Sequence, residues 1–145
     1  MSKKEVTESL KLLLVNTYAL YIKTQNYHWN VSGPNFYSLH IMFEEQYKDL
    51  AEAVDTIAER MRTLGERAPA SFSLYNKLKT ISDPDHELAS NNMLKDLVNS
   101  HEEILHLLNK LVEISQKSQD RTCEDLAIQR ISIHEKTIWK LKSSL

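Results

Sequence analysis

The chain has 145 residues, about the size of one domain, and 18 basic against 20 acidic side chains give a formal net charge of −2. This balance argues against binding to nucleic acid or an anionic membrane through a basic field. A single cysteine, Cys123, excludes an intrachain disulfide. We find neither a membrane span of roughly 20 apolar residues nor a secretory signal, so we expect residues 1–145 to form one cytoplasmic domain.

Glycine and proline are scarce. The chain holds two glycines and three prolines, whereas a β-rich domain of this size needs many more turn residues. These residues fall in three places and leave long uninterrupted segments between them. The composition therefore predicts an all-helical bundle.

The first two helices are predicted over residues 4–31 and 35–64. Apolar side chains recur along both at spacings of three and four residues, with Gln46 as a polar break in the second. The first helix ends at Ser-Gly-Pro, where Gly33 suits a left-handed cap and proline cannot continue the hydrogen-bond ladder. Gly65 marks the end of the second helix.

The connection after the second helix is too long for a plain bundle loop. Its apolar residues predict a short extra helix: Phe72, Leu74, Tyr75 and Leu78. We expect the third long helix to begin near Ser82 or Asp83, either of which would cap it, with Pro84 in its first turn.

The last helix is predicted over residues 122–143. His101 and His134 lie on the apolar faces of the third and last long helices, and we interpret both as structural. Four long helices with one long connection predict the all-α, ferritin-like four-helix bundle, with the short extra helix inside that connection.

Five residues of ligand type gather around the first turn and along the second helix: His28, His40, Glu44, Asp55 and Glu59. His40 and Glu44 are one helical turn apart, as are Asp55 and Glu59. Eleven steps of about 100° from Glu44 to Asp55 return to nearly the same direction, so the stripe is continuous. Imidazole and carboxylate donors together suit Fe(II), Mn(II) or Zn(II).

Distance separates the two halves of this stripe. The fifteen residues from His40 to Asp55 span roughly 22 Å of helix, whereas ligand bonds are about 2 Å long. Two copies of the helix, packed antiparallel about a two-fold axis, would join the halves and create two identical sites. In the alternative interpretation, Asp55 and Glu59 only pair with Arg62 or Arg60 on the helix surface.

Residues 28–65, HWNVSGPNFYSLHIMFEEQYKDLAEAVDTIAERMRTLG, resemble the signature of the Dps-like miniferritins, the DNA-protection-during-starvation proteins. The final segment, RISIHEKTIWKLKSSL, is similar to the last helix of that family. With the first helix, the resemblance covers nearly the whole chain. It implies a hollow dodecamer whose ferroxidase centres lie between two-fold-related subunits.

The resemblance also implies roles for individual residues. One subunit would supply His28 and His40 with Glu44 close by, and the other would supply Asp55 and Glu59. Trp29 would lie beside the centre and could shield or quench it. The implied activity is oxidation of Fe(II) to Fe(III), with hydrogen peroxide preferred over oxygen, and storage of ferric mineral as protection against oxidative stress. Zinc or manganese in the same site, without ferroxidase activity, is a further alternative.

Acidic three-fold pores near the start of the last helix are the implied route for iron. Our candidates are Asp120, Glu124 and Asp125, because rings of negative charge concentrate cations. Alternatively, these carboxylates only complement the helix dipole.

The chain lacks the lysine-rich tail of family members that bind DNA directly, since only Lys3 and Lys4 precede the first helix. Twelve chains would carry 12 × −2, about −24, so we expect weak or no direct DNA binding. The alternative function is a helical oligomer that binds DNA or a receptor and whose metal site is incidental. Substitution of Asp55 and Glu59 distinguishes the two.

Overall fold

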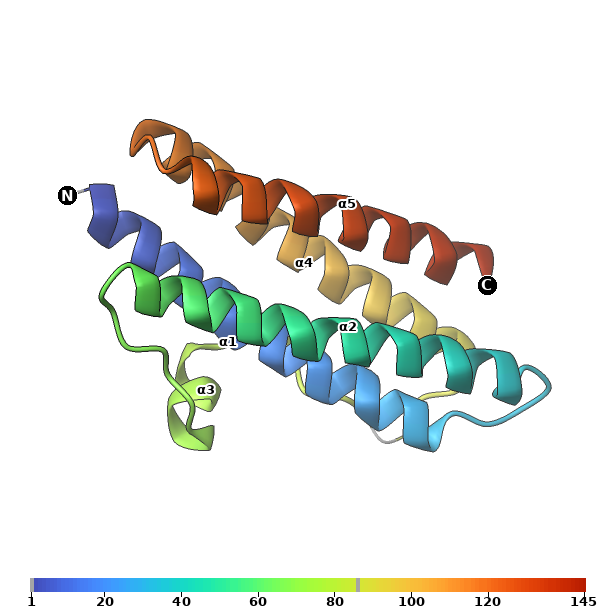
Figure 1. Cartoon of the computed structure of the whole chain (residues 1–145). Helices are drawn as coiled ribbons and strands as arrows, with labels where there is room; N and C mark the ends of the chain where they lie inside the picture. The colour runs from blue at the N-terminus through green and yellow to red at the C-terminus, as the bar shows by residue number, and fades with distance from the viewer. Residues whose placement is uncertain (1, 86) are drawn as a thin grey trace.

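Five helices make up the regular structure of the chain in a computed structural model that describes residues 2–85 and 87–145 (Figure 1). They are α1 (Ser2–Asn30), α2 (Phe36–Thr63), α3 (Phe72–Leu78), α4 (Ser90–Lys117) and α5 (Arg121–Ser143). No strand occurs in the described residues. The all-helical prediction is confirmed, and so is the short extra helix.

The four long helices lie side by side (Figure 1). α1 packs against α2 and α4, and α4 packs against α5. The α1–α2 turn and the C-terminus lie at one end of the bundle, and the N-terminus and the α4–α5 turn at the other. α3 contacts α1 on the side away from α5. The chain between α2 and α4 therefore runs the length of the bundle, as the ferritin-like topology requires.

The core is continuous along the bundle and is filled by aliphatic and aromatic side chains from all four long helices. Its most enclosed members include Leu10, Leu14, Phe43, Leu50, Ile104, Leu108 and Ala127. Burial of this much apolar surface is the main favourable contribution to the fold. Of the described helices, none combines the length and apolarity needed to cross a lipid bilayer.

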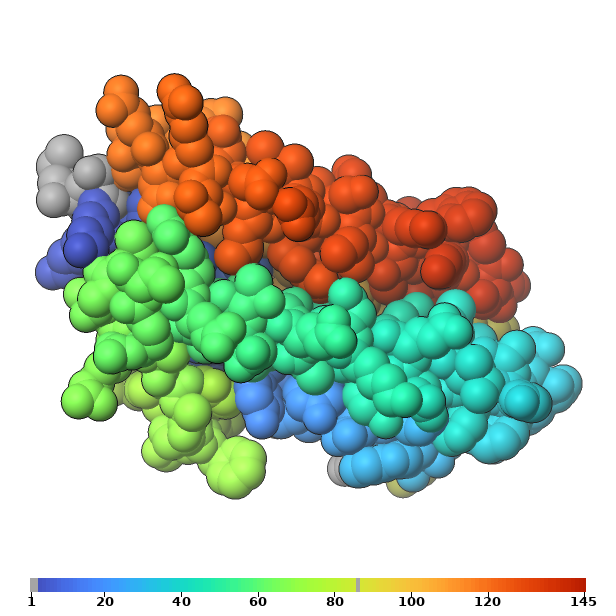
Figure 2. Space-filling model, viewed as in Figure 1, coloured from blue at the N-terminus to red at the C-terminus, as the bar shows by residue number. Residues whose placement is uncertain are grey.

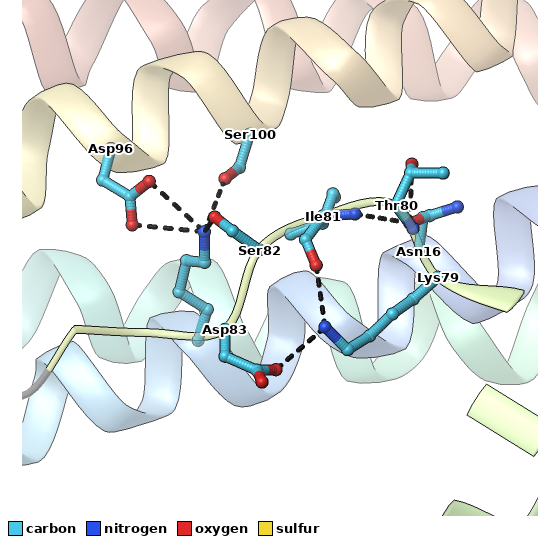
Figure 3. Close-up of polar contacts among 9 residues, drawn as sticks. Asn16, Lys79, Thr80, Ile81, Ser82, Asp83, Asp96 and Ser100 are labelled. Carbon is cyan, nitrogen blue, oxygen red and sulfur yellow. Dashed lines mark hydrogen bonds and ion pairs between the residues drawn. The ribbon is translucent and has the colours of Figure 1, made fainter. Parts of the chain in front are cut away.

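The start of α4 differs from the prediction. The helix begins at Ser90 and is not capped by Ser82 or Asp83. The Ser82 hydroxyl instead accepts a hydrogen bond from Lys23, and the Asp83 carboxylate pairs with Lys79 (Figure 3). Ser82 and Asp83 are residues typical of a helix cap, but here their side chains hold the connection in place and do not cap α4.

The connection ahead of α4 is held to α1 by buried polar groups. The Asn16 side-chain oxygen accepts the backbone N–H groups of Thr80 and Ile81 at 2.8 and 3.0 Å (Figure 3). Lys23, on α1, has no solvent-exposed surface. Its ammonium lies 3.1 Å from a carboxylate oxygen of Asp96 on α4 and also donates to two serine hydroxyls. A buried ammonium is tolerated when all its donors are used in this way.

Replacement of Lys23 by Met should lower the free energy of unfolding by about 2–3 kcal/mol, because Asp96 loses its buried cationic partner. Chemical denaturation of Lys23→Met measures this change. Lys142→Met, which removes a cation from an exposed pair with Glu102, should leave stability nearly unchanged. Adding Asp96→Asn to Lys23→Met should recover part of the loss, and a full additive loss would contradict the pairing.

Candidate metal centre

The turn between α1 and α2 brings two histidines face to face. His28 lies in the last turn of α1 and is buried, and His40 lies near the start of α2 and is half-buried. Their rings stack with centroids 3.9 Å apart and planes 10° apart. The turn that enables this contact contains Gly33 at a φ of +108°, a conformation that side-chain-bearing residues rarely adopt.

Each imidazole donates to the other residue's backbone. His28 Nδ1 lies 2.6 Å from the carbonyl oxygen of His40, and His40 Nδ1 lies 2.7 Å from that of His28. A carbonyl only accepts, so both Nδ1 atoms carry the proton and both Nε2 atoms keep a free lone pair. The His28 carbonyl is also one of the groups left unpaired at the end of α1. The two bonds thus fix ring orientation and tautomer before any metal arrives.

Glu44 lies on the same side of α2 as His40. Its Oε1 is 3.7 Å from His28 Nε2, too far for a hydrogen bond. Two ligand atoms bound to one ion at about 2.1 Å lie roughly 3–3.6 Å apart, so the spacing is close to that of shared ligands. A hydrogen bond from Lys48, and its charge, lower the pKa of Glu44, and the imidazoles act in the same direction. The carboxylate is therefore ionised and ready to bind a cation.

Asp55 and Glu59 are exposed on α2 and lie apart from the histidine pair. No ion pair joins them to Arg60 or Arg62 in the described part of the chain; Arg60 bonds Asp120 instead. The surface-pair interpretation therefore has no support. Across residues 2–85 and 87–145, no three His, Cys, Asp or Glu side chains are grouped so as to hold a metal ion. One chain does not bring the two halves of the stripe together.

A groove of about 670 Å³ follows the seam between α2 and α5, which lie side by side on the face shown in Figure 2. Glu59, Glu52, Asp49 and Asp125 are among its lining residues. Long side chains bridge the seam: Arg130 forms two bonds of 3.0 Å with the Asp49 carboxylate. The groove lining thus holds more carboxylates than guanidinium groups, since Arg60 and Arg130 are its two basic residues.

Large apolar side chains near the histidine pair are exposed. Trp29 is 65% exposed and Tyr37 is 70% exposed. The ring of Phe36 stacks on His40 with centroids 5.0 Å apart. Exposed aromatic groups of this size are typical of surfaces that another protein covers.

The three pore candidates do not share one location. Asp120 and Glu124 line a depression of about 440 Å³ at the α4–α5 turn, whereas Asp125 lines the α2–α5 groove. Asp120 caps α5 by accepting the Cys123 N–H and also accepts two bonds from Arg60. Burial opposes ionisation, but these bonds lower the pKa of Asp120 overall. Its oxygens are already used, so Glu124 is the freer carboxylate of this depression.

Two contacts of the site escaped the sequence analysis. Tyr47 packs edge-on against the His28 ring, with centroids 5.2 Å apart, and its position one turn after Glu44 was the available signal.

Cys123 is buried and accepts a bond from Arg60 Nε at 3.2 Å. Burial, the largest influence, raises the pKa of Cys123 to about 11, so this thiol is not a reactive nucleophile.

Comparison with known proteins agrees with this architecture. A sequence model of the ferritin-like domain matches residues 7–145. The structure of the Dps protein of Vibrio cholerae O1 superposes with a TM-score of 0.94 at 32% identity, covering 98% of this chain and 89% of that one. That protein is described as a member of a broad superfamily of ferritin-like diiron-carboxylate proteins. Antigen TpF1 of Treponema pallidum gives a TM-score of 0.96 at 30% identity over 99% of this chain and 93% of that one.

Relatives found by sequence similarity identify the family of ferritin-like proteins to which the chain belongs. DNA protection during starvation protein 2 of Bacillus anthracis is 32% identical over 142 residues, which are 98% of this chain and 97% of that protein. An uncharacterised low temperature-induced protein of Nostoc is 37% identical over 90% of this chain and 74% of its own length. The chain belongs to the Dps family of ferritin-like proteins.

Proposed function

We propose that the chain is a subunit of a dodecameric shell that oxidises Fe(II), with hydrogen peroxide preferred over oxygen, and stores the ferric product as mineral. The observation that carries the proposal is the locked histidine pair, in which two Nε2 lone pairs are held free beside an ionised Glu44. Removing Fe(II) and peroxide together prevents formation of hydroxyl radicals, which is the protective effect we infer.

A second copy of the chain completes the centre in this proposal. His28 and His40 with Glu44 nearby would face Asp55 and Glu59 of the two-fold-related copy. The exposure of both carboxylates supports this arrangement, and so does the helix length of roughly 22 Å that separates His40 from Asp55 in one chain. Trp29, exposed in the single chain, would be covered at the same interface.

Iron is the substrate of this reaction, and the chain's side chains prepare it for oxidation. Neutral imidazoles bind Fe(II) through Nε2, and carboxylates favour Fe(III) over Fe(II) because they neutralise more charge. Two Fe(II) ions, one peroxide and two protons give two Fe(III) ions and two waters. Zinc or manganese suits the same donors and would compete for the site.

Iron would approach along acidic side chains near the start of α5. Glu124 and Asp125 are the candidates that remain free of the helix cap, and Asp120 would act mainly through its charge. The shell of about −24 formal charge repels phosphate, so protection would act through iron and peroxide chemistry rather than through tight contact with DNA.

Stopped-flow absorbance tests the ferroxidase proposal. The protein is loaded with Fe(II) without oxygen and mixed with hydrogen peroxide, and ferric absorbance is followed in the near ultraviolet. We expect rapid oxidation by the wild type and a loss of the rapid phase in Asp55→Asn/Glu59→Gln, because the second half of the centre is removed. Glu103→Gln/Glu113→Gln changes the charge equally at exposed positions of α4 and should retain the rapid phase. Equal slow traces from all three proteins would exclude this site as a ferroxidase.

A further inference from the structure

Four tyrosine rings follow one another away from the histidine pair. Tyr47, on α2, lies 5.2 Å from His28 between ring centroids. Tyr47 stacks on Tyr21 of α1 at 5.8 Å. Tyr21 meets Tyr18, one turn earlier on α1, at 5.6 Å. Tyr75 on α3 lies 5.0 Å from Tyr18. Each distance falls within the range of about 4.5–7 Å for direct aromatic contact.

These four tyrosines, which we call the tyrosine path, connect three helices in one direction. They begin at the proposed metal ligand and end on α3, which lies on the side of α1 away from α5 and from the α2–α5 groove (Figure 1). All four rings are half-buried. Because the rings touch in sequence, an electron can pass along them without a long jump through aliphatic side chains.

The remaining two of the six tyrosines lie outside the path. Tyr27 is buried and donates a hydrogen bond of 2.6 Å to Asp96. Tyr37 is 70% exposed on α2. Neither has a ring contact with His28 or Tyr47 in the described part of the chain. The ordered contacts therefore distinguish four phenols from two others in the same protein.

We propose that the tyrosine path draws oxidising equivalents away from a partly loaded ferroxidase site toward α3, an inference that rests on the proposed function. Tyr47 is the phenol whose ring contacts His28 among the described residues, and a phenol is more readily oxidised than the imidazole of His40, the other ring in contact with His28. Without such a donor, the oxidant would attack the imidazole ligands themselves. The path thus preserves the site during turnovers in which only one iron is present.

The electron count explains why such a path is useful. With one Fe(II), peroxide is cleaved to hydroxide and a hydroxyl radical, and Fe(II) becomes Fe(III). The radical takes a hydrogen atom from the Tyr47 hydroxyl, which gives water and a tyrosyl radical. Each later step moves one electron and one proton from the next phenol to the radical. A second Fe(II) and one proton return the last tyrosyl radical to the phenol and yield Fe(III).

The hydroxyl groups can release these protons. None of the four is a buried group without a hydrogen-bond partner in the described part of the chain. The Tyr75 hydroxyl donates to the carbonyl oxygen of Pro69 at 2.6 Å, and each of the other three residues is partly exposed to solvent. An alternative role for the rings is packing alone, since they also hold α3 against α1. Tyr→Phe substitutions retain the ring and separate the two roles.

Rapid-freeze electron paramagnetic resonance tests the path. Wild-type protein with less than one Fe(II) per site is mixed with peroxide, and iron oxidation is followed by absorbance in the same mixture. We expect a tyrosyl radical in the wild type, a loss of most of that signal in Tyr47→Phe, and an unchanged signal in Tyr37→Phe. In Tyr21→Phe, spin-trap adducts located by mass spectrometry should shift from Tyr18 and Tyr75 to Tyr47.

The two readouts separate the possible failures. Rapid iron oxidation without a tyrosyl radical, or with a radical of equal intensity in Tyr47→Phe, overturns the path and leaves the proposed function intact. A radical that disappears only in Tyr27→Phe assigns it to the phenol bonded to Asp96 and also overturns the path. Absence of rapid iron oxidation in the wild type overturns the proposed function and the path together.

Discussion

Mixed shells assembled from two inactive variants are expected to recover about a quarter of the wild-type rate of Fe(II) oxidation, because the proposed centre takes its ligands from both chains of a two-fold pair. The first variant, His28→Gln/His40→Gln, keeps both carboxylates. The second, Asp55→Asn/Glu59→Gln, keeps both imidazoles. Neither can form a complete centre by itself.

The fraction follows from counting. At equal amounts and random pairing, about half of the two-fold pairs contain one chain of each kind, and each such pair has one complete centre out of two. The product is about one quarter. Co-expression with two affinity tags and tandem purification yields the mixed shells, and stopped-flow absorbance measures their rate.

Two controls make this result decisive. Each variant alone should assemble normally by size-exclusion chromatography and oxidise Fe(II) only slowly. Joining all four substitutions in one chain and mixing it with the wild type leaves complete centres only where two wild-type chains pair, which again gives about a quarter. If the two inactive variants assemble together and the mixture stays inactive, the shared centre is wrong.

The sequence predicted most of the fold because its helices are marked by local signals. The ends of α1 and α2 lie within one residue of prediction at the turn that holds Gly33, since a glycine at positive φ and a proline stop a helix by local geometry. The start of α4 was missed by several residues. Ser82 is a good cap by local chemistry, but its hydroxyl is bound by Lys23 from α1, a contact 59 residues away that no local pattern reveals.

The candidate site, like the fold, was predicted from local patterns only in part. Helical periodicity placed His40 and Glu44 on one face, and in the structure Glu44 Oε1 lies 3.7 Å from His28 Nε2. The exchange of Nδ1–H bonds between His28 and His40 depends on how the two helix ends meet, so it needed coordinates. The proposed pairing of Asp55 and Glu59 with the histidines would involve a second copy, so neither a local pattern nor a single chain can test it.

A second large effect is expected from the buried histidines His101 and His134. Arg130 donates to His134 Nε2 at 2.9 Å, so His134 carries its proton on Nδ1 and donates it to Nδ1 of His101, 2.8 Å away. His101 Nε2 has no hydrogen-bond partner among the described residues. The Asp49 carboxylate on α2 is engaged by Arg130. A proton added to either imidazole would lie close to the Arg130 guanidinium and would find no free hydrogen-bond acceptor.

These surroundings lower both imidazole pKa values. Burial, and then the charge of Arg130, lower the pKa of His101 from 6.5 to about 3. Burial, then His101 and Arg130, lower the pKa of His134. The unfolded chain therefore binds more protons than the folded chain below pH 6.5. Stability is fully present above that pH and is lost as the pH falls toward the folded-state values.

We expect the free energy of unfolding to fall by about 2 kcal/mol at about pH 5 from His101 alone, with His134 adding in the same direction. Chemical denaturation from neutral pH to about pH 4 measures this loss. In His101→Leu/His134→Leu the acid-dependent loss should shrink by that amount, whatever the variant's stability at neutral pH. His106→Leu, at an exposed position of α4, should keep the wild-type dependence. An unchanged slope in the double variant would assign acid sensitivity to the carboxylates instead, because their protonation is the other proton uptake that accompanies unfolding in this range.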